Sequence, residues 1–359
     1  MVMKGLILAG GSGRRLRPIT HKTAKQLVPI ANKPILHYVI EDLVGIGITD
    51  LGIVVGDTAK EIEKSVGDGS QWNADITYVH QEEPLGLAHA VLISESFLGQ
   101  EKFVMYLGDN MFEDSLHEVV KDFENSATNA RLLLAKVDNP KAFGVAEVDE
   151  QGAIKCLVEK PENPKSDLAL VGVYLFDSTI HRAVKAIEPS DRGELEITDA
   201  IQWMIDEGSN IEQRTLKGWW IDTGKKDPLL LCNELILEKI ETRLLSQIGE
   251  TVTLKGEIVS GENVEIIDSN IQGPVVIGSG VRIERSDIGP YVSIGDECKI
   301  EDSSVERSVL MEKSYVSGVT QLTKSVLGRE VEINGKESEF QEPTSVMLGD
   351  RTKVNLKNG

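Results

Sequence analysis

The sequence predicts an α/β fold in two parts: a Rossmann-like mixed, mostly parallel sheet, followed by a left-handed parallel β-helix. Short apolar runs alternate with amphipathic stretches up to about residue 225, and isoleucines recur every six residues after position 270. At 359 residues the chain is also longer than one hydrophobic core usually accommodates. We therefore expect an α/β domain over 1–225, a connecting helix over 226–250, a β-helix over 251–335 and a cap or tail over 336–359.

The apolar runs of the first part are expected to form strands that are buried on both faces. Amphipathic segments with helical spacing lie between them, and this alternation is typical of a parallel sheet with helices on both sides. Ligands of such sheets bind beyond the carboxyl ends of the strands. The strands are expected at 4–10, 50–56, 75–81, 102–110, 129–137 and 169–176, and the helices at 34–47, 88–99 and 116–127.

The six-residue period predicts the second part. It recurs in two runs, Ile271, Ile277, Ile283 and then Ile288, Ile294, Ile300. In a parallel β-helix, one inward residue on each short side stacks on its equivalent in the next coil. An ordinary β-sandwich is the alternative, but its alternation would have a period of two. A wide apolar face over 226–248 predicts the connecting helix.

Composition narrows the class of protein. Apolar residues make up 40% and charged residues 27%, which is typical of a soluble globular chain. The net charge of −20 argues against binding to nucleic acid or to an anionic membrane surface. Cys156, Cys232 and Cys298 lie far apart without a CxxC pair, so we expect a reducing, cytoplasmic location. No apolar run reaches the 18 residues of a membrane span.

The first forty residues contain seven Lys/Arg and no Asp or Glu, although the chain as a whole is acidic. The positive charge follows Gly10, Gly11 and Gly13, where backbone N–H groups are open to an anion. The loop lacks the GK[ST] of a Walker motif and the third glycine of a dinucleotide fingerprint. A simple tight turn would need the glycines but not the arginines. The segment therefore predicts a triphosphate site, with Arg15 directed at the α/β-phosphates.

Six motifs stand in the order found in one enzyme family: GGSGRRLRPIT, KQLVP, YLGDN, EKP, RGELEITD and WWIDTG. The chain resembles the sugar-1-phosphate nucleotidylyltransferases, and among them it is most similar to the glucose-1-phosphate thymidylyltransferases. The resemblance covers residues 3–228, and the added hexapeptide region is similar to the long form of that family. Ala24 and Phe143 depart from the usual proline and tyrosine without removing a group that the chemistry needs.

The resemblance implies transfer of a nucleotidyl group from dTTP to glucose 1-phosphate, giving dTDP-glucose and pyrophosphate. Two anions must meet, so cationic side chains and a metal ion have to offset their repulsion. The attacking phosphate oxygen is already ionised, so positioning and charge stabilisation can replace a strong general base. By the resemblance, Asp109 and Asp222 bind Mg²⁺; taken singly, an Asp after a strand is more often a turn or helix cap.

Two lysines and one arginine are expected at the phosphates. The resemblance assigns Lys25 to the triphosphate, and Lys160 and Arg192 to the sugar phosphate. Each lysine alone would ordinarily be a solvated surface residue. Arg192 could instead be an ion-pair partner of Glu194 or Glu196.

The remaining expected contacts recognise the base and the sugar. A glutamine amide can pair with the N3–H and a carbonyl of a pyrimidine, so Gln26 and Gln81 are expected at the base. Four of the residues that the resemblance places at the nucleotide or the sugar have another possible role: Gly86 could begin a helix, Val173 and Trp220 could pack in the core, and Thr198 could cap a helix. The resemblance places Leu8, Gly10, Gly11, Gly13, Gly86 and Asp109 at the nucleotide, and Gly144, Glu159, Val173, Thr198 and Trp220 at the sugar.

Two other functions stay open at this point. The same machinery could use UTP, or an N-acetylated hexosamine phosphate, because the C5 methyl of thymine is worth only about 1–3 kcal/mol. A non-catalytic sugar-nucleotide sensor is disfavoured, because Arg15, Lys25, Asp109, Lys160 and Asp222 are all present. No histidine follows His181, so we expect the β-helix to be structural and to assemble the chain into a homo-oligomer, a trimer or larger.

Overall fold

The computed structural model describes residues 3–21, 23–246, 249–335 and 343–356. The chain divides into two compact units, and each is built from separate stretches of sequence. The first unit spans Met1–Ser12 and Leu36–Ile221, and the second spans Gly13–Ile35 and Asp222–Gly359. The glycine loop is therefore divided: its beginning belongs to the first unit, and its basic continuation belongs to the second.

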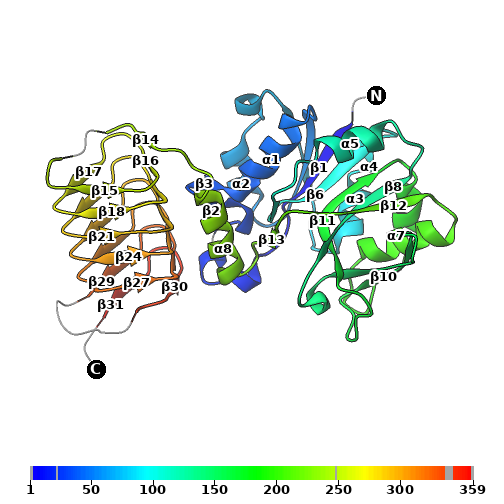
Figure 1. Ribbon diagram of the computed structural model, residues 1–359. Helices are drawn as coiled ribbons and strands as arrows, with labels where there is room; N and C mark the ends of the chain where they lie inside the picture. Colours follow the sequence, from blue (N-terminus) through cyan, green and yellow to red (C-terminus); the bar gives the residue numbers. More distant parts are fainter. Residues whose placement is uncertain (1–2, 22, 247–248, 336–342, 357–359) are drawn as a thin grey trace. The chain divides into compact units, whose positions relative to one another are not determined.

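A nine-stranded mixed sheet forms the centre of the first unit (Figure 1). The sequence predicts a mixed sheet and six of these strands; β9, β10 and β12 were not expected. The main path of the sheet runs β10-β9-β11-β6-β1-β4-β5, and β8 joins β11 to β12. The pairs β1–β4, β1–β6, β4–β5 and β8–β12 are parallel, whereas the pairs that β11 makes are antiparallel. The strands are β1 Lys4–Leu8, β4 Asp50–Val55, β5 Asp75–His80, β6 Phe103–Leu107, β8 Ala130–Lys136, β9 Gly144–Val148, β10 Ile154–Glu159, β11 Leu168–Phe176 and β12 Ile211–Thr215.

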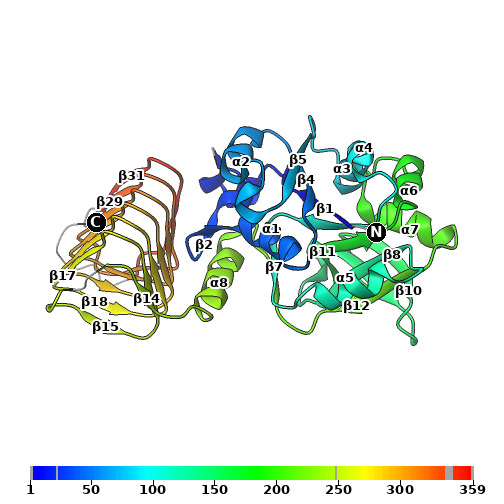
Figure 2. The same cartoon turned by 90° about the horizontal axis from the view of Figure 1, so that it is seen from above.

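Helices cover this sheet because their apolar faces need a partner. Helices α3, α6 and α7 contribute to one core together with β1, β6, β8 and β11, and α5 lies on the other side of the strands (Figure 2). A two-stranded ribbon joins β7 Asn110–Phe112 to β13 Trp220–Asp222. The helices are α1 Ile35–Gly45, α2 Ala59–Val66, α3 Leu87–Ile93, α4 Glu95–Leu98, α5 His117–Glu124, α6 Ile180–Ala186 and α7 Ile197–Asp206.

Parallel pairing brings two predicted loops to one edge of the sheet. Leu8 and Leu107 are register partners at the carboxyl ends of β1 and β6, and the Gly108 N–H donates to the Leu8 carbonyl at 3.0 Å. The glycines after β1 and Asp109 after β6 therefore leave the sheet side by side. This is the edge at which open parallel sheets bind ligands.

Three parallel sheets wind the second unit into the expected left-handed β-helix, drawn from yellow to red in Figure 1. The first contains β14 Arg243–Leu244, β16 Ile258–Ser260, β19 Val275–Ile277, β22 Val292–Ile294, β25 Val309–Leu310, β28 Val326–Leu327 and β30 Met347–Leu348. The second contains β15 Thr253–Lys255, β18 Asn270–Gln272, β21 Asp287–Ile288, β24 Ser304–Glu306 and β27 Leu322–Thr323. The third contains β17 Glu265–Ile267, β20 Arg282–Glu284, β23 Lys299–Glu301, β26 Tyr315–Ser317, β29 Glu332–Asn334 and β31 Lys353–Asn355.

All six isoleucines of the predicted period lie in the β-helix core, each at most 1% exposed. The register pairs Ile271 with Ile288, Ile277 with Ile294 and Ile283 with Ile300. One coil therefore advances 17 residues rather than 18, because the step from Ile283 to Ile288 is one residue shorter than the others. This shorter turn explains why the six-residue period breaks into two runs.

Other parts of the second unit flank the coils. The predicted connecting helix is α8 Lys226–Leu237, which ends before the expected residue 248, and β14 follows it. Residues 336–342 and 357–359 of the expected tail lie outside the described residues, but β30 and β31 extend two of the sheets beyond 335. The segment Gly13–Ile35 forms short 3₁₀ turns η1 Arg14–Leu16, η2 Ile19–His21 and η3 Lys25–Leu27 and the ribbon β2 Pro29–Ile30 with β3 Lys33–Pro34. In the described part of the chain, no helix is both long and apolar enough to cross a membrane.

Candidate active site

Glycine allows a close backbone approach directly after β1. A methyl group added at Gly10 would lie 3.2 Å from Gln81 Oε1, and one added at Gly56 would lie 3.0 Å from the Gly10 carbonyl oxygen. The Ala9 N–H donates to the Val54 carbonyl at 2.8 Å, which extends the pairing of β1 and β4 into the loop. Gly10 and Gly11 thus follow a rigid strand end, beside the predicted base-binding Gln81.

Gln81 belongs to a small polar cluster that the sequence identified only in part. Its Nε2 lies 3.3 Å from the Gly86 carbonyl oxygen and 2.9 Å from His89 Nδ1. Burial lowers the pKa of His89, so this ring is neutral at pH 7 and can accept a hydrogen bond from the amide through Nδ1. His89 was missed, although a histidine three residues after Gly86 on α3 was a usable signal. Gly86 needs its glycine, because its φ is +107° and a methyl group would lie 2.3 Å from the Leu195 carbonyl oxygen.

The predicted sugar-phosphate cations meet around one carboxylate. Lys160 Nζ lies 3.1 Å from Glu159 Oε1, and Arg192 Nη1 lies 3.3 Å from the same oxygen. Arg192 also reaches Glu194 at 2.9 Å and Glu196 at 3.2 Å, which are the ion pairs expected as its alternative role. Burial raises the pKa of Glu196, and Glu159 adds to this, while the Ser190 hydroxyl and Arg192 oppose it. The acidic side chains outnumber the cations here, so the cluster is not a bare phosphate site.

Thr198 lies next to this cluster at the start of α7. A methyl group added at Gly144 would lie 2.8 Å from Thr198 Cγ2 and 3.1 Å from Glu159 Oε2, so the glycine leaves room between them. The Thr198 hydroxyl is buried and, among the described residues, has no hydrogen-bond partner. A helix cap would bond to the backbone, so capping does not explain this threonine.

Val173 and Trp220 differ in exposure. Val173 is 1% exposed within β11, which agrees with the alternative of core packing. Trp220 is only half-buried, and its Nε1 donates a hydrogen bond to Asn110 Oδ1 at 2.7 Å. Its ring packs edge-on against Phe143, with 4.9 Å between the ring centroids. Position 143, one of the two departures from the family pattern, thus supports the tryptophan through its aromatic ring.

The two predicted metal ligands are both carboxylates at strand ends. Asp109 is 5% exposed and accepts a hydrogen bond from Asn110 Nδ2 at 3.3 Å. Asp222 ends β13; its Oδ1 accepts the Gly224 N–H at 2.9 Å, and its Oδ2 pairs with Arg15 Nη2 at 3.1 Å. The described residues contain no group of three or more His, Cys, Asp or Glu arranged to hold a metal.

The second unit holds the predicted triphosphate residues in the segment Gly13–Ile35. Gly13 has a φ of +62°, and a methyl group there would lie 3.1 Å from Lys25 Cβ. Gln26 follows Lys25 in η3 and is fully buried. Both its Oε1 and its Nε2 lack a partner among the described residues. An amide without partners in a protein interior is costly, so an ordered water or a ligand is needed to complete its hydrogen bonds.

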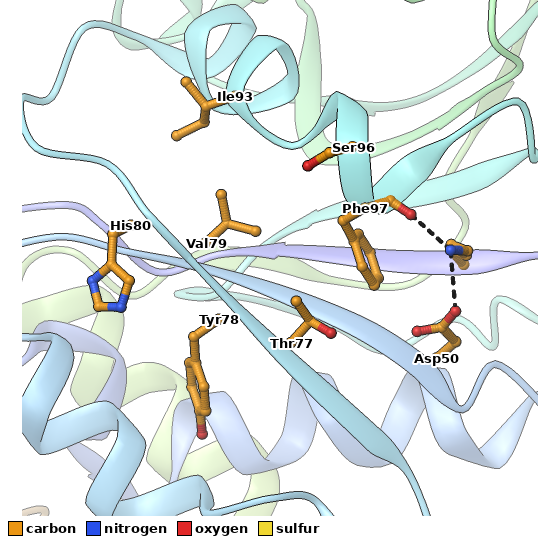
Figure 3. A pocket seen from close by; sticks show the side chains of 9 residues that line it. Asp50, Thr77, Tyr78, Val79, His80, Ile93, Ser96 and Phe97 are labelled. Carbon is orange, nitrogen blue, oxygen red and sulfur yellow. Dashed lines mark hydrogen bonds and ion pairs between the residues drawn. The ribbon is translucent and has the colours of Figure 1, made fainter.

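A separate hollow of about 650 Å³ lies over β5 and beside α3 and α4 (Figure 3). Thr77, Tyr78, Val79 and His80 line it together with Phe97 and others. It includes none of the predicted site residues. It is therefore distinct from the clusters described above.

Comparison with known proteins decides the family. The nucleotidyl transferase family matches residues 4–239. The chain belongs to the nucleotidyl transferase family. It is 48% identical over 359 residues to the glucose-1-phosphate thymidylyltransferase of Streptomyces antibioticus, covering 99% of this chain and 100% of that protein.

Solved structures agree with this nucleotidyl transferase assignment. A provisionally named glucose-1-phosphate thymidylyltransferase from Bacillus anthracis, in complex with sucrose, is 37% identical with a TM-score of 0.63. It covers 67% of this chain and 98% of its own. A UDP-glucose pyrophosphorylase in complex with UDP-glucose is 25% identical with a TM-score of 0.60, over 67% of this chain and 100% of its own. The enzyme class and the fold predicted from sequence are thereby confirmed.

Proposed function

We propose that this nucleotidyl transferase transfers the thymidylyl group of dTTP to glucose 1-phosphate, releasing pyrophosphate and forming dTDP-glucose. One observation supports this most directly. The Gln26 amide and the Thr198 hydroxyl are buried without partners among the described residues, and they are the residues expected at the base and at the sugar. A substrate with a pyrimidine edge and hydroxyl groups would complete both. The full-length thymidylyltransferase relative supports dTTP over UTP.

On the nucleotide side, we propose that Gln26 and Gln81 bind the thymine edge. Leu8, Gly10, Gly11, Gly13, Gly86 and Asp109 complete the nucleotide contacts. Arg15 and Lys25 bind the phosphates, since a guanidinium and an ammonium can stabilise the charge that develops on departing pyrophosphate. A dTTP with its α-phosphorus held in this way is open to attack from the side opposite the leaving group.

On the sugar side, Lys160 and Arg192 would bind the phosphate of glucose 1-phosphate. Glu159 then accepts hydrogen bonds from sugar hydroxyls, and Thr198 donates or accepts one. Gly144 and Trp220 complete the wall of this subsite, and Val173 supports it from the core. The phosphate oxygen is a nucleophile without prior deprotonation, so the role of these residues is to hold it in line with the leaving group.

We further propose that Asp109 and Asp222 bind Mg²⁺. Both are carboxylates at strand ends, and hard oxygen donors suit this ion. When bound, the ion would neutralise phosphate charge and favour pyrophosphate as a leaving group. In the free protein Asp222 is paired with Arg15. Substrate phosphates would give that arginine a new partner.

A substrate panel tests the assignment. The purified protein is incubated with Mg²⁺, each of dTTP, UTP and ATP, and either glucose 1-phosphate or N-acetylglucosamine 1-phosphate, and pyrophosphate release is measured. We expect the highest kcat/KM with dTTP and glucose 1-phosphate. A clear preference for UTP would replace the thymidylyl assignment by a uridylyl one. No turnover with any pair, combined with tight binding of a nucleotide sugar, would favour the sensor.

Three further expectations remain proposals. A homo-oligomer, a trimer or larger, would form through the β-helix. Light scattering on the protein as it elutes from a size-exclusion column tests this. A cytoplasmic location agrees with the three cysteines, which form no disulfide among the described residues, and is tested by cell fractionation. The domain boundaries near 225, 250 and 335 predict where limited proteolysis cleaves first.

A further inference from the structure

The segment Gly13–Ile35, which contains the proposed phosphate and base residues of the second unit, is attached to the rest of that unit at two places, near its middle and near its end. Near the middle of the segment, Thr23 is 1% exposed. Its hydroxyl accepts a hydrogen bond from Arg329 Nη1 at 3.0 Å and lies 3.4 Å from Asp350 Oδ2. Thr23 and Arg329 are 306 positions apart in sequence, so folding of the C-terminal coils brings this contact about.

Arg329 is itself held firmly by the β-helix. It follows β28, its Nε donates to Glu312 one coil earlier, and its backbone N–H donates to Asp350 Oδ1 at 2.9 Å. The coil that contains Asp350 also approaches the segment closely at Pro18. A methyl group added at Gly349 would lie 2.6 Å from the Pro18 carbonyl oxygen. Two adjacent coils therefore contact the segment through a charged hydrogen bond and through tight backbone packing.

The end of the segment is attached by a different set of bonds. The Ala31 N–H donates to Asn233 Oδ1 of α8 at 2.9 Å, and Ser293 of the β-helix donates to the same oxygen at 2.7 Å. Asn32 Nδ2 donates to the Ile294 carbonyl at 2.6 Å. Asn233 is fully buried, so these bonds are shielded from water. Lys25 and Gln26 lie between the two attachments.

We propose that Arg329 is a positioning residue of the nucleotide site: through Thr23 it fixes Lys25 and Gln26, two and three residues further along the chain. The C-terminal β-helix is then part of the substrate-binding apparatus rather than only an assembly element. This inference rests on the proposed function, because it assigns Lys25 and Gln26 to dTTP. A charged hydrogen bond to a buried hydroxyl is strong enough to hold a short turn in one conformation.

Arg329→Gln and Thr23→Val test the proposal by kinetics. Each is expected to raise KM for dTTP about 3- to 10-fold, since one hydrogen bond to a charged group is lost. KM for glucose 1-phosphate should stay unchanged. Thr23→Val also removes the contact with Asp350, and Arg329→Gln also removes the pair with Glu312, but both remove the Arg329–Thr23 bond. The double variant should therefore raise KM for dTTP by less than the product of the two single effects. The matched control is Arg285→Gln, which breaks an equivalent ladder pair with Asp302, 17 residues away. Among the described residues, Arg285 has no bond to the segment.

Hydrogen–deuterium exchange provides a readout that needs no substrate. Arg329→Gln should speed exchange of the backbone amides in residues 19–28, and Arg285→Gln should not. If the wild type proves inactive on dTTP while this difference remains, the proposed function fails and the attachment stands. If Arg329→Gln and Arg285→Gln act alike, or if the two single effects add, Arg329 has only a structural role and the proposal is overturned.

Discussion

Replacing Gln26 by methionine should stabilise the free protein and weaken nucleotide binding. The side chain is fully buried, and neither its Oε1 nor its Nε2 has a partner among the described residues. Each buried polar atom without a partner costs about 1–3 kcal/mol. Methionine has a similar volume and places no strong donor or acceptor there. Taking the lower end of that range for both atoms, Gln26→Met should raise the free energy of unfolding by about 2 kcal/mol.

The same substitution removes the amide from the bound state. Thymine would then bury its N3–H and a carbonyl without partners, at a cost of about 2–3 kcal/mol. This corresponds to a rise of roughly 30- to 150-fold in KM for dTTP. The assays are thermal unfolding without and with dTTP, and initial rates of pyrophosphate release. The melting temperature should rise for the free protein, whereas the further increase produced by dTTP should shrink.

Gln202→Met is the matched control, because this glutamine has both partners. Its Oε1 accepts the Leu157 N–H at 3.0 Å and its Nε2 donates to Asp206 at 2.9 Å. We expect this variant to be less stable by about 1–3 kcal/mol, since the Leu157 N–H loses its acceptor, with an unchanged KM for dTTP. A Gln26→Met protein that melts lower than the wild type, or keeps its KM for dTTP, would refute the reasoning.

Three further predictions concern the carboxylates. Asp109→Asn and Asp222→Asn should each abolish turnover at saturating Mg²⁺ with an unchanged circular dichroism spectrum; near-normal rates would reject the metal assignment. The pKa of Glu196 is raised in the native state, so protonation of this carboxyl favours folding, and that stabilisation is lost as pH rises above the ordinary value of 4.5. Glu196→Gln should therefore reduce the fall in the free energy of unfolding between acidic pH and pH 7, measured by urea unfolding. Glu159→Gln should strengthen inhibition by inorganic phosphate and raise KM for glucose 1-phosphate, because Lys160 and Arg192 lose a shared partner; unchanged inhibition would contradict it.

The strands and the β-helix core were predictable because burial leaves a local trace in sequence. The runs that became β6 and β11 are apolar throughout, and those that became β1 and β4 are apolar after a charged first residue. The six recurring isoleucines all proved to be buried. The 17-residue coil was harder to predict, since one shortened turn hides it from a fixed six-residue period. The membership of Gly13–Ile35 in the second unit had no local signal. Contacts such as Asn32 to Ile294 join residues 262 positions apart.

For the site, the sequence indicated which residues come together but not which ion pairs they form or how deeply they are buried. The sequence indicated Glu194 and Glu196 as possible ion-pair partners of Arg192, but only the structure shows that Glu159 is a third partner. Glutamine is usually exposed, so nothing in the sequence indicated that the Gln26 amide is buried without partners. His89 was missed because a lone histidine on a helix has many ordinary explanations.

A common feature of the proposed phosphate-binding cations suggests how the site selects its ligands. Arg15 is paired with Asp222, and Lys160 and Arg192 share Glu159. These basic side chains are 40–52% exposed, so each pair is worth at most about 1 kcal/mol. The carboxylates hold the cations in place and discourage simple monovalent anions, but a dianionic phosphate or a triphosphate with its metal can replace them at little cost. Selectivity for highly charged substrates would then arise from competition with the protein's own acids rather than from a permanently open cationic pocket.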